Sequence, residues 1–416
     1  MLLNITVENF RSYDKEQTLS LIASNENFIN TSKVGTFNVY KSAVIYGANA
    51  SGKSNLIKAI SVLQNVISNG VSSKYYQPFF FNNRDTRFNI DFEIKGKIYT
   101  YSIHYNAEYI DYEALLDESE NIIFERIFKK LEGKYEYVVP NAEKLLSEGQ
   151  LDIAETMLKT WQLSTNKDRS FLTQIIDSGC EKLKDILPLF DIRPNKTPKI
   201  IFRDNQYINT INPFMPQADL LFATNYYRLH DDFESINIAM QAIGATFNRI
   251  TPQDVNVSPS DGANNAKPFT LNTTYNINGQ DINVNFFQFE SDGTQKFYNY
   301  YALLKFVIEN ESILIVDELE AHFHPLLVEE IITQINNSDS KAQLIFTSHS
   351  PLLLNEGVFE REQIYFAEKN EDNTTNLFSL ADFKDLKDVK DIVAKYLSGN
   401  FGAIPYFHSI DFDSDK

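Results

Sequence analysis

Eight consecutive residues, 47–54, carry the clearest chemistry in this chain. Their sequence, Gly-Ala-Asn-Ala-Ser-Gly-Lys-Ser, fits the pattern G-x-x-x-x-G-K-[ST] of a phosphate-binding loop. In such a loop, backbone N–H groups surround a phosphate and a helix places its positive dipole end behind it. Lys53 is expected to reach the β- and γ-phosphates of a nucleotide, and Ser54 to hold Mg²⁺. The residues expected to contact the nucleotide are Gly47, Ala48, Asn49, Ala50, Ser51, Gly52, Lys53, Ser54 and Asn55.

The residues around this loop support a phosphate site over a chance match in a glycine turn. Residues 42–46 are short, apolar and rich in β-formers, as expected for a buried strand. After the loop, apolar residues recur at helical spacing, and Gly70 is a plausible helix end. The spaced apolar residues are Leu56, Ile57, Ile60, Leu63 and Ile67.

A second strand is expected to complete the nucleotide site with two carboxylates. Residues 312–318 form a continuous apolar run that ends in Asp317 and Glu318, as in a strand buried on both faces of a parallel sheet. Asp317 is placed to bind Mg²⁺, directly or through water, and Glu318 to act as general base toward the attacking water. Taken alone, this pattern favours a core strand followed by a solvated acidic turn; the functional interpretation is preferred because the phosphate loop is also present.

Two further segments offer candidate residues. The strand expected at 343–347 is followed by His349, which at the carboxyl end of the same sheet could touch a γ-phosphate. Ser291 and Gly293 precede a helix expected from Thr294 to Glu309, where the serine could cap the helix and the glycine could let backbone approach a ligand. Taken alone, an ordinary helix cap is the simpler interpretation of Ser291.

The composition of the chain indicates where the protein is located and which kinds of partner it binds. The chain has 416 residues and 43% hydrophobic residues, and it shows neither a 20-residue apolar stretch nor a signal peptide. Cys180 is the only cysteine, so no internal disulfide is possible. These features indicate a cytoplasmic protein without a membrane partner. The net charge of −18 disfavours duplex DNA as the main ligand and favours a basic protein partner.

Three regions are expected along the chain. Residues 1–112 read as one half of an α/β ATPase core, with strands around the phosphate loop and a hairpin at 88–103. Residues 113–198 read as a charged helical insertion that contacts a partner or a second copy, with helices at 143–161 and 171–187. Residues 199–416 are expected to form the second half of the core. Within this region, a loop at 255–267 is expected to be mobile.

Taken in order, these segments resemble the ABC-type ATPases of the RecF, SMC and OLD group. The order is phosphate loop, long insertion, S-x-G signature, acidic strand ending in Asp-Glu, and switch histidine; an early Asn-Phe-Arg-Ser at 9–12 adds to it. The resemblance covers both ends of the chain and misses the middle. It implies an α/β, ABC-type P-loop ATPase core with an N-terminal antiparallel β subdomain and an inserted α-helical subdomain.

The resemblance also implies roles for individual residues. Lys53, Glu318 and His349 would be catalytic, Ser54 and Asp317 would hold Mg²⁺, and ATP would be the nucleotide. Ser291 and Gly293 would contact the γ-phosphate held by the opposite subunit, and residues 319–325 would lie at that dimer interface. The signature reads Glu-Ser-Asp-Gly-Thr-Gln rather than the transporter form, which favours defence-type and RecF-type branches. Gln77 is the candidate for the Mg²⁺-contacting Q-loop glutamine. His322 and His324 have no further ligand cluster to suggest a metal site.

Residues 394–405, near the end of the sequence, indicate a more specific group within this family. They are similar to the endings of bacterial ATPases encoded beside a small nuclease, including RloA-like proteins, abortive-infection ATPases and the AriA subunit of the PARIS anti-phage system. This implies an ATP-sandwich dimer that controls a basic effector such as a TOPRIM, HNH or RloB-type nuclease. Two alternatives remain open: a RecF-like repair ATPase that binds DNA directly, and a stand-alone nuclease that uses the acidic residues 411–415, which otherwise read as a solvated tail.

Overall fold

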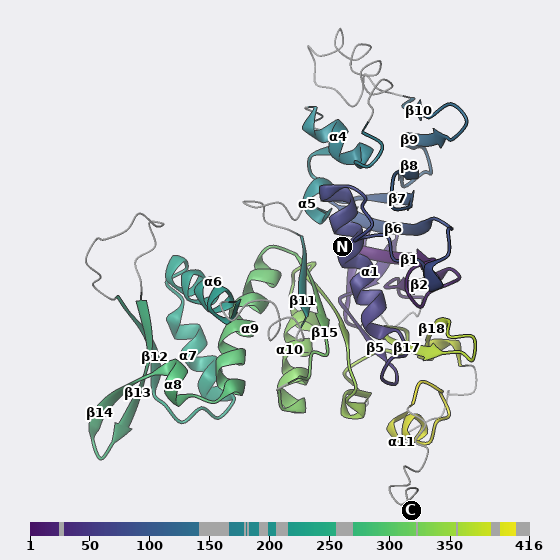
Figure 1. The fold of residues 1–416 in the computed structure, drawn as a ribbon. Helices are drawn as coiled ribbons and strands as arrows, with labels where there is room; N and C mark the ends of the chain where they lie inside the picture. Colours follow the sequence, from purple (N-terminus) through teal and green to yellow (C-terminus); the bar gives the residue numbers. More distant parts are fainter. Residues whose placement is uncertain are drawn as a thin grey trace, which may run out of the picture.

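A computed structural model gives the fold of the chain (Figure 1). The structure describes residues 1–24, 29–140, 166–178, 180, 183–190, 199–204, 215–254, 269–321, 323–354, 357–383 and 392–404. The helix expected at 143–161, the loop expected at 255–267, His322 and the acidic residues 411–415 lie outside these ranges. No helix in the described ranges is both long and apolar enough to cross a bilayer.

A central sheet holds the strands that the sequence pattern predicted. Its six strands lie in the order β11-β15-β16-β5-β17-β18, and all neighbours pair in parallel except β17 and β18. Each of β5, β15 and β16 is buried along its whole length, which explains their unbroken apolar sequences. The strand bounds are β5 Ser42–Tyr46, β11 Ile200–Asp204, β15 Ile313–Asp317, β16 Gln343–Thr347, β17 Ile364–Lys369 and β18 Thr375–Ser379.

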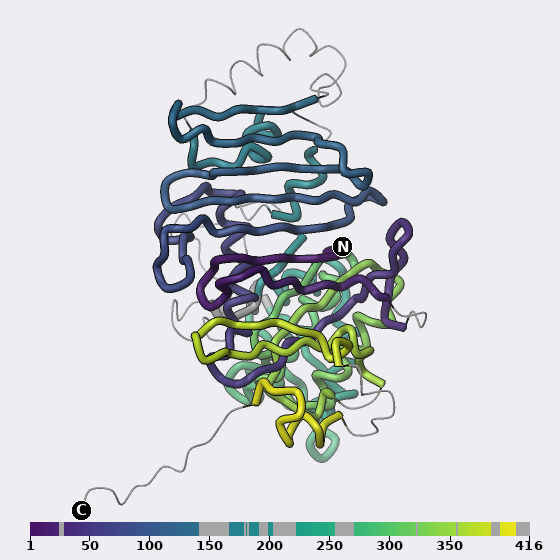
Figure 2. Tube along the Cα trace, turned by 90° about the vertical axis from the view of Figure 1, so that its right-hand side faces the viewer, coloured from purple at the N-terminus to yellow at the C-terminus, as the bar shows by residue number. Residues whose placement is uncertain are grey.

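A second, antiparallel sheet belongs to the N-terminal part of the chain. It has seven strands in the order β10-β9-β8-β7-β6-β1-β2, which are stacked from top to bottom in Figure 2. The expected hairpin is present as β6 and β7, joined across Lys95 and Gly96. The bounds are β1 Leu2–Glu8, β2 Gln17–Ser20, β6 Thr86–Ile94, β7 Lys97–Tyr105, β8 Ile110–Asp117, β9 Ile122–Lys129 and β10 Lys134–Val138; a separate hairpin joins β3 Thr31–Val34 to β4 Phe37–Tyr40.

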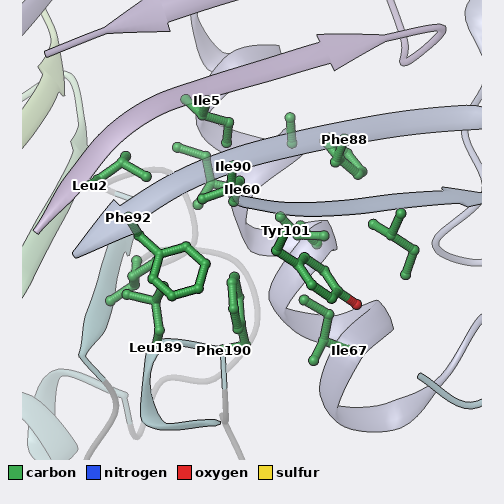
Figure 3. Close-up of a cluster of buried hydrophobic side chains, with 14 of the residues drawn as sticks. Leu2, Ile5, Ile60, Ile67, Phe88, Ile90, Phe92, Tyr101, Leu189 and Phe190 are labelled. Atoms are coloured by element: carbon green, nitrogen blue, oxygen red, sulfur yellow. The ribbon is translucent and has the colours of Figure 1, made fainter. Parts of the chain in front are cut away.

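Helix α1, Lys53–Asn69, packs between the two sheets. Its buried Ile60 and Ile67 meet β-sheet residues such as Phe88 and Tyr101 in one hydrophobic cluster (Figure 3). The same cluster includes Ile313 and Ile315 of β15, whereas Leu314 and Val316 face the other core. The helix that begins at the phosphate loop is therefore fixed by apolar contacts on both sides. It ends at Gly70, as expected.

Helices cover the other face of the central sheet. Helix α9 contacts α6, α7 and α10, and together with that sheet face they enclose the second hydrophobic cluster. A three-stranded sheet, β12-β13-β14, extends beyond α7 (Figure 1). The bounds are α6 Met215–Leu229, α7 Phe233–Ala242, α8 Phe286–Phe289, α9 Asp292–Glu309, α10 Pro325–Asn337, β12 Arg249–Asp254, β13 Phe269–Ile277 and β14 Gln280–Asn285.

The expectation of a helical block from residue 113 is wrong for its first part. Residues 110–138 form β8, β9 and β10, and among the described residues that follow, two short helices are present, α4 at Phe171–Asp177 and α5 at Leu187–Phe190. The reason is a charged pair that faces inward. Glu113 and Arg126 are cross-strand partners, both fully buried, and their side chains are 2.7 Å apart. Charges at inward positions hide the alternation that would have indicated strands.

The C-terminal residues 392–404 pack behind the strand that leads into the phosphate loop. Helix α11, Ile392–Leu397, supplies Tyr396, whose ring lies 5.7 Å from that of Tyr46, the last residue of β5. Phe366 of β17 stacks on both Tyr396 and Phe401. These residues therefore form part of the core next to the loop. The α/β class with an added antiparallel β sheet, expected from the sequence, is confirmed.

Candidate nucleotide site

The phosphate loop joins β5 to α1 with the backbone open to an anion. Gly52, the residue before the helix, has φ 112°, and Ala50 has φ 62°. Both angles lie in the left-handed region, which suits glycine and is uncommon for alanine. No side chain caps the first turn of α1, and no acidic residue lies in it. The first N–H groups of the helix and its dipole are therefore available to a phosphate.

Lys53 lies folded back over the loop. Its Nζ donates to the carbonyl oxygens of Gly47 at 2.7 Å and Ala48 at 3.0 Å. Burial lowers the pKa of Lys53 to about 8, while the carboxylates of Asp317, Glu318 and Glu320 partly oppose this shift. The ammonium is thus a partly desolvated cation beside an anion-binding loop, and a triphosphate would supply the negative charge that favours its protonated form.

Asp317 is the centre of a small hydroxyl network. Its Oδ1 accepts hydrogen bonds from Ser54 Oγ at 3.1 Å and from Thr347 Oγ1 at 2.6 Å, and its side chain is buried. Because β15, β16 and β5 are parallel neighbours, their carboxyl ends bring these three residues to one edge of the sheet. A hydroxyl and a carboxylate side by side are the hard oxygen donors that suit Mg²⁺.

Glu318 and His349 lie next to each other at the same edge. Glu318 has φ 55°, a strained conformation held by a hydrogen bond from its N–H to Thr347 Oγ1 at 2.8 Å. Its Oε1 is 3.8 Å from His349 Nε2. Burial and the nearby Lys53 lower the pKa of His349 below its usual value, so its imidazole is neutral at pH 7. The expected base and the expected switch histidine are thus brought together.

Glu320 holds the backbone of the histidine in place. Its Oε1 accepts the N–H of His349. Within the described residues, its Oε2 is buried and has no hydrogen-bond partner, and the same is true of Ser51 Oγ in the phosphate loop. Orphaned buried oxygens beside a cation and an open helix end are typical of a site that binds a polar ligand. The residues present fit a nucleoside triphosphate with its Mg²⁺.

Gln77 is connected to the loop through Arg11. Arg11 Nε donates to Gln77 Oε1 at 2.6 Å, and its N–H donates to the Gln77 carbonyl at 2.8 Å. Arg11 Nη1 also contacts Asn55 Oδ1 at 3.3 Å, and Asn55 Nδ2 donates to Ser12 Oγ at 2.8 Å. The early Asn-Phe-Arg-Ser segment therefore lies beside the first turn of α1. No contact in the structure tests a role for Gln77 toward Mg²⁺.

Sequence reasoning missed two residues that organise this site. Thr347 links the carboxylate of Asp317 to the backbone of Glu318. Thr375, on β18, donates to the carbonyl of Ser51 at 2.8 Å, and its hydroxyl also lies 2.8 Å from Ser12 Oγ. A threonine that ends an apolar strand is a weak signal for Thr347. Thr375 had no signal, because its place depends on the pairing of β17 with β18.

The structure places Ser291 and Gly293 in a different part of the molecule. Ser291 caps α9, accepting the N–H of Thr294 at 3.2 Å. Both residues line a cavity of about 770 Å³ between α7, α9 and α10, together with His324, whose Nδ1 accepts the N–H of Leu326 at 3.3 Å. Lys53, Asp317 and His349 are not among the residues that line this cavity.

Comparisons with known proteins agree with this geometry. A family model described as "AAA domain, putative AbiEii toxin, Type IV TA system" matches residues 42–355. The Septu protein PtuA of Bacillus mycoides (strain KBAB4) is 33% identical over 88 residues, which are 20% of this chain and 12% of that protein. The matched segment thus spans only a small part of that relative.

Two solved structures are similar to this chain at low identity and low TM-score. The SMC head domain from Thermotoga maritima has a TM-score of 0.42 and 12% identity, covering 91% of this chain and 98% of the other. The SmcHead bound to the C-winged helix domain of ScpA has a TM-score of 0.45 and 14% identity, covering 91% and 97%.

The family match includes the phosphate loop, the acidic strand and the histidine, and it spans more than half of the chain. The chain therefore belongs to the family described as "AAA domain, putative AbiEii toxin, Type IV TA system".

Proposed function

We propose that this chain binds and hydrolyses ATP, pairs with a second copy around two ATP molecules, and controls a partner effector in anti-phage defence. The observation that carries the enzymatic part is the meeting of Lys53, Ser54, Asp317, Glu318 and His349 at one sheet edge. The defence role is supported by the family description and by the similarity to PtuA. A cytoplasmic location follows from the same proposal.

Each residue at the sheet edge has a distinct task in this proposal. Lys53 binds the β- and γ-phosphates, and the N–H groups of the loop hold the remaining phosphate oxygens. Ser54 and Asp317 would hold Mg²⁺, which when bound would neutralise charge that develops on the phosphate oxygens. His349, neutral at pH 7, donates a hydrogen bond to the γ-phosphate.

Glu318 is the proposed base. Its carboxylate accepts a proton from water as the water oxygen bonds to the γ-phosphorus and the bond from phosphorus to the bridging oxygen breaks. ADP and inorganic phosphate are the products, and the proton on Glu318 passes to solvent or phosphate. The hydrogen bond from its N–H to Thr347 sets the position of the residue before any nucleotide arrives.

The second copy completes each site. Ser291 and Gly293 lie at the N-terminus of α9 and line a cavity whose lining does not include Lys53, Asp317 or His349. We therefore propose that they contact the γ-phosphate held by the partner. ATP would then be part of the interface and would favour the paired state to the extent that it binds that state more tightly. The net charge of −18 favours a basic effector, and a nuclease held inactive until infection is the effector that we propose.

Substitution of Glu318 tests the proposal most directly. Glu318→Gln should keep ATP binding and lengthen the paired state, because the amide cannot accept a proton. Hydrolysis should fall by at least about 100-fold, in line with the loss of a general base. Lys53→Ala is the matched variant that should lose ATP binding itself. Undiminished hydrolysis by Glu318→Gln would exclude Glu318 as the base, and undiminished binding by Lys53→Ala would exclude the loop as the phosphate site.

A further inference from the structure

Two phenylalanine side chains project from a turn beside the phosphate site. Residues Phe79–Phe81 form a 3₁₀ turn, in which Phe80 is 66% exposed and Phe81 is 91% exposed. Their φ angles are 43° and 56°, a conformation that bulky residues rarely adopt. A strained turn that displays aromatic rings to solvent points to a contact outside the described chain. We call this turn the aromatic tip.

The tip is held rigidly by the early motif. Asn9 is fully buried, and its Oδ1 accepts the N–H of Phe79 at 3.2 Å and Asn82 Nδ2 at 2.8 Å. Tyr76 OH donates to the carbonyl oxygen of Arg84 at 2.8 Å and lies 3.1 Å from that of Asn82. Phe79 and Phe80 meet edge to face, with ring centroids 4.6 Å apart. Because the backbone of the turn is already held by these hydrogen bonds, little backbone entropy would be lost when the tip docks.

The signature side of the chain offers a matching apolar groove. The cavity of about 770 Å³ between α7, α9 and α10 is lined in part by Ser291 and Gly293. Its apolar lining includes Ile238, Phe297, Tyr301 and Leu326, of which Ile238 is 61% exposed and Leu326 is 69% exposed. We call it the signature groove. Exposed aliphatic side chains around a hollow of this size are typical of a protein contact surface.

We propose that the aromatic tip of one copy docks in the signature groove of a second copy, an inference that rests on the proposed ATP-bound pair. The tip follows Gln77, which is linked through Arg11 to the first turn of α1. The groove adjoins the serine and glycine proposed to reach the partner's γ-phosphate. In the proposed pair, α9 of one copy lies against the phosphate loop of the other. Because the groove is next to α9 and the tip is next to the loop, the same pairing would bring the groove and the tip together.

Charge at the two surfaces fits this contact. The exposed Lys74 lies at the base of the tip, where its carbonyl accepts Gln77 Nε2 at 2.8 Å. The exposed Glu330 lines the groove on α10. In a chain of net charge −18, two copies repel each other unless opposite charges meet at the interface. A twofold pair makes the contact twice, so four aromatic rings would be buried.

Thiol cross-linking between two differently tagged copies tests the contact. The chain has one cysteine, Cys180, which is buried, so introduced thiols report alone. Asn83→Cys in one copy and Gln334→Cys in the other should be joined by a short bis-maleimide when ATP and Mg²⁺ are present, in a Glu318→Gln background. Asn121→Cys, on a turn of the antiparallel sheet, is the matched control and should not be joined to Gln334→Cys.

Loss of the rings should weaken pairing without affecting nucleotide binding. The double variant Phe80→Ser/Phe81→Ser should raise the ATP-dependent dimer dissociation constant at least about tenfold, because central aromatic contacts dominate interfaces. Leu131→Ser, which removes a fully exposed side chain elsewhere, should leave it unchanged. The reversal Glu330→Lys should weaken pairing, and Lys74→Glu in the partner should restore it.

The outcomes separate this inference from the proposed function. If the ATP-dependent pair forms normally with Phe80→Ser/Phe81→Ser and no cross-link joins tip and groove, the docking contact is wrong while the ATP sandwich stands. If Glu318→Gln forms no pair at saturating ATP, both proposals are wrong. Unaltered ATP affinity in the double variant is required, because a loss would show that the substitutions damaged the nucleotide site.

Discussion

At the scale of single residues, the chemistry of the site depends on the burial of two charged side chains, Lys53 and Asp317. Lys53 is almost fully buried among backbone carbonyls, and three carboxylates lie near enough to oppose the shift that burial imposes. Asp317 is buried as well, but it accepts two hydroxyl donors. Lys53 is thus a desolvated cation, and a bound polyphosphate would meet it together with the N–H groups of the loop.

The lowered pKa of Lys53 predicts how ATP affinity depends on pH. Without nucleotide, Lys53 loses its proton near pH 8, whereas a bound triphosphate would favour the protonated form. ATP affinity should therefore be constant near pH 7 and fall above pH 8, by up to about tenfold per pH unit. Titration calorimetry between pH 7 and 9.5 would measure this fall. A flat profile for the wild-type chain would contradict the assignment of Lys53.

The stability of the nucleotide-free chain should change in the opposite direction. A lysine whose folded pKa lies below its unfolded value of 10.5 disfavours folding when both states are protonated, below about pH 8. As pH rises from 8 toward 10.5, this cost decreases, so Lys53 contributes relatively more stability there. Lys53→Arg stays charged over the whole range and should show neither trend, which makes it the control for both measurements.

Glu320 is predicted to position His349 rather than to bind ATP. Its carboxylate accepts the N–H of His349, and hydrogen bonds to a charged acceptor contribute about 1.5–3 kcal/mol. Glu320→Gln should lower kcat about tenfold or more, because the histidine is less well placed, while the affinity for ATP changes little. Steady-state kinetics with separate kcat and KM values would distinguish this result. Glu329→Gln, exposed on α10, should have no effect, and an equal loss in both variants would contradict the prediction.

At the scale of secondary-structure elements, sequence patterns predicted the strands and helices that carry the site. The unbroken apolar runs of β5, β15 and β16 and the periodic apolar residues of α1 are local signals, and each element lies where the pattern indicated. The joining of their ends into one site depends on strand order, which the motif order suggested through the family resemblance. Thr375 and Gln77 could not be assigned contacts in this way, because those contacts cross between distant elements.

Strands β8 to β10 show why the rest escaped sequence reasoning. Glu113 accepts hydrogen bonds from Arg126 Nε, Tyr101 OH, Ser170 Oγ and the first N–H groups of α4. From sequence alone, a charged residue such as Glu113 is expected to be exposed to solvent. The partners that allow it to be buried come from distant parts of the chain, so no local pattern reveals them. The charged residues from 113 onward therefore suggest a helix in the sequence, although residues 113–138 lie in strands β8 to β10 and the turns between them.

The same network predicts a large loss of stability on substitution. Glu113→Ala would leave the guanidinium of Arg126 buried without its carboxylate and would remove the acceptor for the N-terminus of α4. The expected cost is about 3–5 kcal/mol, typical of breaking a buried pair by removing one partner. Denaturant unfolding would measure it. Glu136→Ala, which breaks an exposed pair with Lys129, should cost less than about 1 kcal/mol.

At the scale of the whole molecule, the phosphate loop lies between two elements that contact other parts of the chain, strand β5 before it and helix α1 after it. Helix α1 packs against the antiparallel sheet on one side and against the central sheet on the other. The C-terminal residues Tyr396 and Phe401 pack behind β5, the strand that leads into the loop. A displacement of the loop would therefore be felt by both the antiparallel sheet and the C-terminal segment, the surfaces on which an effector could read the nucleotide state.

Mixing two inactive variants tests the largest claim, that each copy supplies what the other lacks. Lys53→Ala removes the phosphate ligand from a copy's own site, whereas Ser291→Arg blocks only the site of its partner. A pair with one copy of each has one dead site, which carries both changes, and one site with both residues intact. The geometry supports this design because Ser291 lines the signature groove and Lys53 does not.

An equal mixture should thus hydrolyse ATP when neither variant alone does. Random pairing of the two variants gives half mixed pairs with one intact site each, so the activity should approach about a quarter of the wild-type value if the sites act independently. The control is a mixture of Lys53→Ala with the double variant Lys53→Ala/Ser291→Arg, which contains no intact site in any pair. Mixed pairs that form, as shown by differently tagged copies, but remain inactive would mean that Ser291 does not act across the interface. Activity of Ser291→Arg alone would mean that each chain hydrolyses ATP without its partner's α9.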